Sequence, residues 1–168
     1  MAFIYETENF EVITHERPFV SRTDGGHIKI VSKAGVEDRT KLKPAEAVEL
    51  MRLTMLIGEA FQIAMNNIGI PVVKINYQDL GNWAYKTNTK PHLHIHLFGR
   101  AENAKVQVFP EAVYLPARET GFYDGFEHLK EEDILEIQEQ IKKLEKKDKY
   151  NIQNWKLKME YWGKDNEI

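Results

Sequence analysis

Three histidines stand at alternate positions in one short stretch of the chain: His92, His94 and His96. Successive side chains of a β-strand point to opposite faces, so in a strand these three imidazoles share one face. A helix turns by about 100° per residue and would leave them with no common face. The apolar residues between and after them, which can be buried against a core, are Leu93, Ile95 and Leu97. The sequence therefore predicts a strand over residues 91–98 that displays a row of histidines.

Such a row allows three interpretations. Strict alternation argues against unrelated, half-exposed strand residues. Two neutral imidazoles at i and i+2 can share a zinc ion. However, His92 and His96 would lie about 13 Å apart along a strand. A further ligand would have to come from elsewhere, with Asp79, His27 and Glu16 as candidates that no spacing selects.

Covalent catalysis is the third interpretation. A neutral imidazole has a pKa near ~6.5 and can itself attack an electrophile. Imidazoles on either side can hold the attacking tautomer or donate hydrogen bonds to the oxygens of a phosphate. No Ser-His-Asp arrangement is indicated, and the chain has no cysteine for a Cys-His pair. The residues therefore suit phosphoryl or nucleotidyl transfer better than acyl transfer.

Composition limits the class of protein. The chain has 168 residues, of which 42% are hydrophobic and 29% charged, as in a single globular domain. The absence of cysteine excludes disulfides and Cys-based zinc sites, and the net charge of −3 gives no bulk attraction to nucleic acid. Residues 1–6 lack the pattern of a signal peptide, and no stretch is apolar enough to span a membrane. We expect a cytoplasmic protein that binds neither nucleic acid nor membrane.

Three further strands are expected beside the histidine strand. Residues 10–15, 27–32 and 71–78 are rich in β-branched and aromatic residues and are bounded by turn signals. The Thr-Asp-Gly-Gly sequence at 23–26 favours an antiparallel arrangement of the first two. The polar stretch 79–90, which contains Trp83 and Tyr85, leads into the histidine strand; these aromatic rings are suited to stack on a base or to pack over the sheet edge.

One long helix separates these strands into two pairs. Pro44 suits the first helical position, and apolar residues then recur at three- and four-residue steps as far as Ile68. Gly69 and Pro71 end the pattern. Two strands, a helix and two strands predict an α+β fold with a mostly antiparallel sheet and one long helix.

The rest of the chain is expected to extend this core. Residues 106–126 mix prolines and glycines with five aromatic residues, which predicts a long ordered loop because so many rings need burial. Glu131 opens a helix whose apolar stripe ends at Leu144, and a second stripe from Ile152 predicts another helix. We therefore divide the chain into a core, 1–105, and a C-terminal helical extension, 106–168, packed on the same domain.

The stretch from His92 to Phe98 resembles the His-φ-His-φ-His-φ-φ signature, with φ apolar, of the histidine-triad (HIT) nucleotide hydrolases and transferases. The region 18–33, with Gly26-His27, is similar to the family's Pro-Gly-His strand. Asn88-Thr89 is similar to its Gln-Ser/Thr pair. With the long helix in the expected place, the resemblance covers residues 9–100.

This resemblance implies a HIT-like fold, a homodimer, a nucleotide substrate and no cofactor. It implies that His94 attacks the α-phosphate and forms a nucleotidyl-histidine, which water then hydrolyses. His92 and His96 would orient His94 and contact phosphate. The substrates implied are dinucleoside polyphosphates or nucleoside phosphoramidates. The residues implied to contact substrate are Thr89, Asn88, Gln78 and His27.

Two features distinguish this chain within the family. The corresponding pattern of uridylyltransferases is similar to His-x-His-x-Gln. This chain has His96 at the third position and therefore resembles the hydrolases. His15 stands where the family commonly has Asn or Asp for the ribose hydroxyls. The change at His15 and the added C-terminal helices leave a second hypothesis open, a nucleotide-binding module with little or no catalysis.

Overall fold

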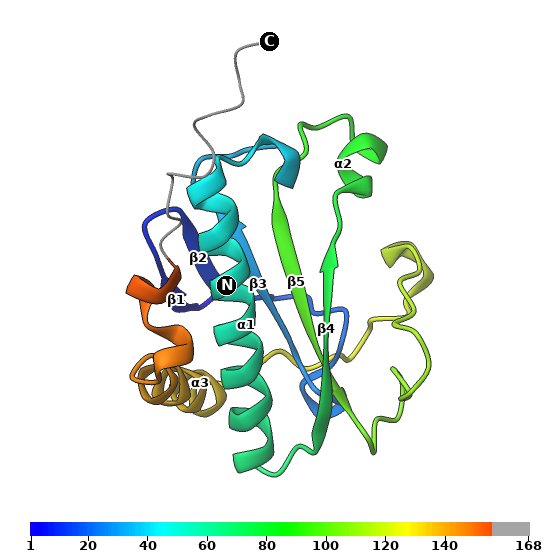
Figure 1. The fold of residues 1–168 in the computed structure, drawn as a ribbon. Coiled ribbons are helices and arrows are strands. Elements are labelled where there is room, and N and C mark those ends of the chain that lie inside the picture. The colour runs from blue at the N-terminus through cyan, green and yellow to red at the C-terminus, as the bar shows by residue number, and fades with distance from the viewer. Residues whose placement is uncertain (156–168) are drawn as a thin grey trace.

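The computed structural model describes residues 1–155. Its centre is a five-stranded sheet in the order β1-β2-β3-β5-β4 (Figure 1). The strands are β1 Phe3–Glu6, β2 Phe10–Thr14, β3 His27–Ser32, β4 Val72–Asp79 and β5 His94–Ala101. All four pairings are antiparallel, so the predicted α+β fold with a mostly antiparallel sheet is confirmed.

The sequence located three of these strands to within one residue and missed or misplaced two. β1 was not predicted because its four residues are too few to show a period. β5 begins at His94, not at residue 91 as predicted. Its partner β3 ends at Ser32, and the preceding residues pair irregularly: Leu93 accepts from the Ser32 N–H and donates to the Val36 carbonyl. His92 therefore precedes the strand.

Helix α1, Pro44–Asn67, confirms the predicted long helix. Pro44 stands in its first turn, and the Glu46 carboxylate accepts the Lys43 N–H at 2.9 Å. This contact satisfies an amide that the helix itself leaves free. The apolar stripe of α1 is buried against the sheet, where Ile28, Ile30 and Ile95 point away from the histidine face.

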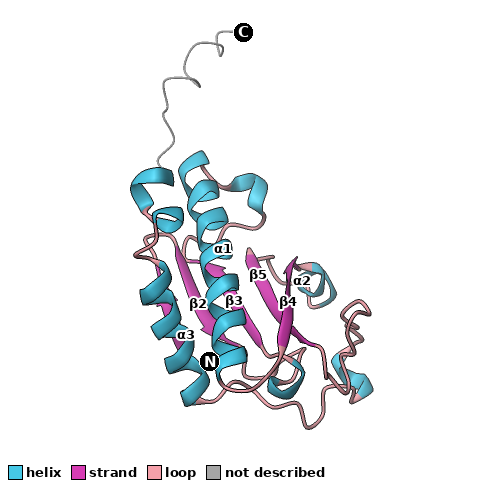
Figure 2. Ribbon diagram, turned by 60° about the horizontal axis from the view of Figure 1, so that its bottom comes forward, coloured by secondary structure: helices cyan, strands magenta, loops and turns pink. Residues whose placement is uncertain are grey.

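Helix α3, Glu131–Leu144, lies beside α1 on the same face of the sheet (Figure 2). Its residues Ile137, Ile141 and Leu144 are buried in one cluster with α1 and the sheet. Each fully buried side chain of this size contributes roughly 1.5–3 kcal/mol through removal from water. The second predicted C-terminal helix is described only as a short 3-10 helix, Ile152–Trp155; the remainder of that prediction falls outside the described residues.

Residues 106–126 cross the opposite face, the one that carries the histidines. They form the predicted ordered loop, with one 3-10 turn at Arg118–Thr120. The expected burial of its aromatic rings holds for part of the loop: Tyr123 is buried with Phe19, Val20 and Phe98, and Phe122 and Phe126 pack against this cluster. Tyr114, in contrast, is 61% exposed. This second, smaller core fixes the loop against one end of the sheet.

A buried carboxylate anchors the start of this loop. Asp24 is 2% exposed and accepts the backbone N–H groups of Lys105, Val106 and Gln107 at 2.7–2.9 Å. The buried Gln107 amide in turn donates to the carbonyl oxygens of Phe19 and Tyr114. Since buried polar groups must be paired, these contacts specify one path for the loop.

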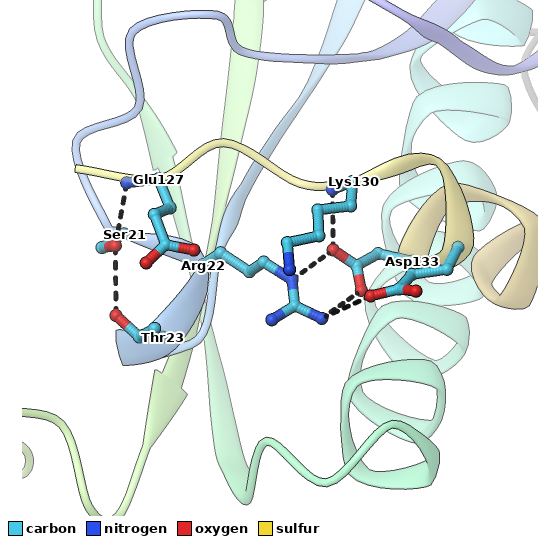
Figure 3. A network of polar contacts seen from close by, with 7 residues as sticks. Ser21, Arg22, Thr23, Glu127, Lys130 and Asp133 are labelled. Carbon is cyan, nitrogen blue, oxygen red and sulfur yellow. Dashed lines mark hydrogen bonds and ion pairs between the residues drawn. The ribbon is translucent and has the colours of Figure 1, made fainter. Parts of the chain in front are cut away.

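A second anchor joins the β2–β3 connection to α3. The Arg22 guanidinium forms a two-point contact with the buried Asp133 carboxylate, at 2.6 and 2.8 Å (Figure 3). Asp133 also accepts the Lys130 N–H at 2.8 Å and so caps α3, and Glu127 N–H donates to Ser21 (Figure 3). Removing one partner of a buried ion pair typically costs about 3–5 kcal/mol. The extension is thus held to the segment that precedes β3.

The polar stretch 79–90 contains a short helix that the sequence did not predict, α2 Asn82–Lys86. Through residue 155, the structure has no helix long and apolar enough to cross a membrane.

Candidate active site

His94 and His96 lie on the same face of β5, with ring centroids 4.7 Å apart. The Nδ1 atom of His94 is 2.6 Å from the His92 carbonyl oxygen. Because a carbonyl only accepts, Nδ1 carries the proton and Nε2 has a free lone pair. Burial lowers the pKa of His94 below its usual value. The ring is therefore neutral at pH 7 and presents a nucleophilic nitrogen.

The tautomer of His96 is fixed by a chain of hydrogen bonds behind it. The Phe19 N–H donates to His27 Nδ1 at 3.2 Å, so the proton of a neutral His27 is on Nε2. That atom lies 2.8 Å from His96 Nδ1, which must accept. The remaining nitrogen of His96, Nε2, then carries a proton. His96 is thereby set as a hydrogen-bond donor beside the lone pair of His94.

Burial keeps this chain neutral. It is the main reason that the pKa of His27 falls well below its usual value and that the pKa of His96 falls to about 2. Protonation of His96 would also make its Nδ1–H face the Nε2–H of His27, two donors with no acceptor between them.

The position of His27 depends on a tight backbone crossing: a Cβ on Gly99 would lie 2.0 Å from the Gly25 carbonyl oxygen.

His92 differs from the other two histidines. Its ring is exposed and its Nε2 donates to the Ser32 carbonyl at 2.7 Å. The prediction of three equivalent rings on one strand face is therefore corrected, since β3 ends before it can pair regularly with residue 92. The backbone carbonyl of His92, rather than its ring, holds His94.

A cavity of about 640 Å³ opens over the histidines. One side is formed by residues 80–84 together with Thr87, Thr89 and Lys90, the other by residues 15–17 with Phe19 and Arg118. Lys29 and the three histidines lie between these sides, since Lys29 pairs with His96 across β3 and β5.

The other predicted substrate contacts are placed unequally. Thr89 lines the cavity, and its hydroxyl lies 3.0 Å from that of Thr87. Gln78 is opposite His96 in the sheet, and its buried Oε1 has no hydrogen-bond partner within residues 1–155. Asn88 is exposed and does not line the cavity; its φ of 52° marks a tight turn that Asn tolerates.

His15 lines the cavity at the end of β2, with its ring stacked on His27 at 4.7 Å. The Arg17 N–H donates to its Nδ1 at 3.2 Å. Burial, followed by the charges of Lys29 and Arg118, lowers the pKa of His15 to about 3. A neutral His15 therefore carries its proton on Nε2 and offers a donor, not the acceptor that Asn or Asp would supply.

Lys29 and Arg118 were not predicted as site residues. Lys29 shares the parity of His27 in the strand 27–32, so alternation was a signal that pointed to the same face. Arg118 comes from the long loop, and no local pattern indicates where a loop of this kind leads. Its guanidinium lies 4.3 Å from the centre of the Phe19 ring and 5.2 Å from that of Tyr123.

Residues 1–155 contain no group of three or more His, Asp or Glu side chains arranged to hold a metal ion. Two of the candidate ligands are engaged elsewhere: Asp79 accepts from Arg39 at 2.9 Å, and Glu16 pairs with the amino group of Met1.

Comparisons with known proteins agree with this architecture. The HIT domain model matches residues 1–103. A histidine triad nucleotide-binding protein from Sulfolobus tokodaii is 19% identical, with a TM-score of 0.57, and the alignment covers 88% of this chain and 87% of that one. A zinc-bound histidine triad family protein from Mycobacterium smegmatis is 22% identical, with a TM-score of 0.55 and 85% coverage of both chains. A histidine triad protein from Marinobacter aquaeolei is 15% identical, with a TM-score of 0.56, covering 85% of this chain and 90% of that one.

These three likenesses concern the fold, and their alignments extend beyond the 103 residues that the domain model matches. The search of curated proteins finds no match. The domain match spans more than half of the chain and includes the whole histidine row. The protein therefore belongs to the HIT family.

Proposed function

We propose that the protein is a nucleotidyl hydrolase that cleaves at the α-phosphate of a dinucleoside polyphosphate or a nucleoside phosphoramidate. One observation carries the proposal: the hydrogen bonds around His94 and His96 leave a lone pair on one ring and an N–H donor on the other, side by side. This pair has the two functions that displacement at phosphorus requires, a nucleophile and a group that binds the phosphate oxygens.

In the first step, the lone pair of His94 Nε2 attacks the α-phosphorus. A P–N bond forms, the bond to the leaving group breaks, and the leaving group departs with its electron pair. The ring becomes a substituted imidazolium whose Nδ1–H stays bonded to the His92 carbonyl. The carbonyl dipole stabilises this positive charge, as a hydrogen-bonded carboxylate does in a Ser-His-Asp triad.

In the second step, water attacks the phosphorus of the nucleotidyl-histidine. The P–N bond breaks and returns its electrons to His94 Nε2, and a nucleoside 5′-monophosphate is released. The leaving group takes up a proton from solvent in the first step, and in the second step water supplies the hydroxyl of the product and returns a proton to solvent. Throughout, the N–H of His96 donates to a non-bridging phosphate oxygen, since its other nitrogen is occupied by His27.

The remaining substrate contacts in this proposal are Thr89, Gln78 and Asn88. Gln78 has a buried amide oxygen that lacks a partner among the described residues, a group that a ligand or water can satisfy. Thr89 lines the cavity, whereas Gln78 does not and lies opposite His96 in the sheet. Asn88 would have to turn inward to contact the leaving group, because its side chain is exposed in this structure.

A panel of dinucleoside polyphosphates and nucleoside phosphoramidates, assayed for release of nucleoside monophosphate, tests the activity. At least one substrate should be hydrolysed by the wild type. The second candidate function, a nucleotide-binding module, is favoured by His15, which offers a donor where the family commonly offers an acceptor to the ribose. Tight nucleotide binding in calorimetry without hydrolysis of any member of the panel would establish the module and reject the hydrolase.

We also propose a homodimer, as family membership suggests. β4 is an edge strand of the sheet, and it exposes Val73 and Tyr77. Unpaired strand edges with apolar side chains are natural pairing surfaces. Light scattering should give a dimer for the wild type and a monomer for Val73→Lys; a monomeric wild type would reject the proposal.

A further inference from the structure

Lys29 lines the cavity as a cation with no counter-ion among residues 1–155. It is only partly exposed and makes no hydrogen bond or ion pair with any side chain in these residues. Loss of hydration lowers the pKa of its amine, and no neighbouring carboxylate counteracts this effect. A half-buried ammonium is unfavourable without a partner, so a ligand is the natural source of the missing negative charge.

Arg118 supplies a second cation on the same side. One of its amino groups donates to the Arg17 carbonyl at 2.6 Å, and its plane is held over Phe19. None of the carboxylates through residue 155 forms an ion pair with it. A guanidinium has five N–H donors in a fixed plane, which leaves several of them for a ligand.

His15 connects these two cations. Lys29 is opposite Ile13 of β2, two residues before His15. The Arg118 guanidinium lies 4.3 Å from the centre of the Phe19 ring, whose centre is 5.5 Å from that of His15. The charges of both cations also lower the pKa of His15. Its Nε2–H is a donor, because the Arg17 N–H bonds to Nδ1. Three donors, two of them charged, thus face one region of the cavity. The one carboxylate residue of the cavity lining, Glu16, is occupied by the amino group of Met1.

This arrangement matches an anion better than a ribose diol. A ribose hydroxyl both donates and accepts hydrogen bonds, and an Asn or Asp can accept its proton, whereas none of these three groups can. A phosphate monoester has only acceptor oxygens in its ionised form, and Lys and Arg are the side chains that bind it best. The pattern of donors therefore indicates the chemistry of the group bound there.

We propose that His15, Lys29 and Arg118 form a second phosphate-binding site, and that the substrate is a nucleotide that carries a phosphate on its sugar in addition to the 5′-phosphate. The proposal rests on the proposed function, because it takes the 5′-phosphate to be the group attacked by His94. Lys29 is opposite His96 in the sheet, so the two phosphate sites are adjacent. The sugar would bridge them, with its 2′- or 3′-phosphate toward His15.

Isothermal titration calorimetry on the full-length protein tests the second site. The ligands are adenosine 5′-monophosphate, adenosine 2′,5′-bisphosphate and adenosine 3′,5′-bisphosphate, so that the contribution of the base cancels. At least one bisphosphate should bind about tenfold or more tightly than the monophosphate, as expected for added charged hydrogen bonds. Equal affinities, or no binding of any of the three, would overturn the proposal.

Substitutions of Lys29 test whether this site causes the preference for the bisphosphate. Lys29→Met should reduce the ratio of the monophosphate to the bisphosphate dissociation constant from about tenfold or more to less than about threefold. Lys29→Arg should retain the preference, because it keeps the charge. Lys142→Met makes the same change of net charge at an exposed position of α3 outside the cavity and should bind like the wild type. A preference that survives in Lys29→Met would overturn the assignment.

The two proposals fail separately. Preference for a bisphosphate without hydrolysis of any nucleotide would support the second phosphate site and reject the hydrolase. Hydrolysis that depends on His94, without a preference for any bisphosphate in binding, would retain the hydrolase and reject the second site.

Discussion

The histidine row and the wall formed by His15, Lys29 and Arg118 lie in the same cavity but differ in how their polar groups are satisfied. In the row, the Nδ1 atoms of both His94 and His96 are fixed, one by a backbone carbonyl and one by His27. In the wall, two cations lack a carboxylate partner among the described residues. The row is thus organised before a ligand binds, as catalysis requires. The cations of the wall gain an anionic partner only when a ligand binds, as recognition requires.

The largest expected effect follows from loss of the nucleophile. His94→Ala should reduce turnover by at least about 10³-fold, because its neighbour His96 has Nδ1 bonded to His27 and a proton on Nε2. Nucleotide binding should persist, since the wall is unchanged. Steady-state release of nucleoside monophosphate measures the effect, and His128→Ala, at an exposed histidine outside the cavity, is the matched control. Ordinary turnover by His94→Ala would remove the distinction between row and wall.

A smaller effect is expected when the tautomer of His96 is released. His27→Phe keeps an aromatic ring between Phe19 and His96 but removes the donor to His96 Nδ1. kcat should fall by about 10- to 100-fold, with little change in nucleotide affinity. Nitrogen NMR should show a single Nε2–H tautomer of His96 in the wild type and a mixture in the variant. A single tautomer in both would show that His27 does not position His96.

The neutral state of the buried rings of His27 and His96 also makes stability depend on pH. Burial lowers the pKa of His27 and His96 below the value of about 6.5 of the unfolded chain. The unfolded state then binds more protons below about pH 6.5, so the free energy of unfolding falls as the pH falls. Each ring contributes up to about 1.4 kcal/mol per pH unit.

Urea unfolding between about pH 7.5 and 5 measures this slope, and His27→Phe should make it shallower. A free energy of unfolding that stays constant across this range would contradict the conclusion that His27 and His96 are neutral and buried.

The row could be predicted from sequence because it depends on local periodicity. Alternation located His94 and His96 on one face, and the stripe ending at Ile68 located α1. His92 was misplaced because the end of a strand is decided by its partner, here Ser32 of β3. Local sequence does not contain that information.

The residues of the wall could be predicted from sequence only in part. Lys29 alternates with His27 and could have been assigned to the site by the same rule that assigned the triad. Arg118 could not, because its position depends on contacts distant in sequence, such as Asp24 with the backbone at 105–107. The tautomers of His15 and His96 likewise depend on which atoms lie behind each ring.

Rapid-quench mass spectrometry on the wild type, with a substrate that the panel shows to be hydrolysed, tests the central claim most directly. Acid-labile, base-stable nucleotidyl adducts should appear within a single turnover, and peptide mapping should place them on His94. An adduct on His92 or His96, or turnover with no adduct at any time, would contradict the account.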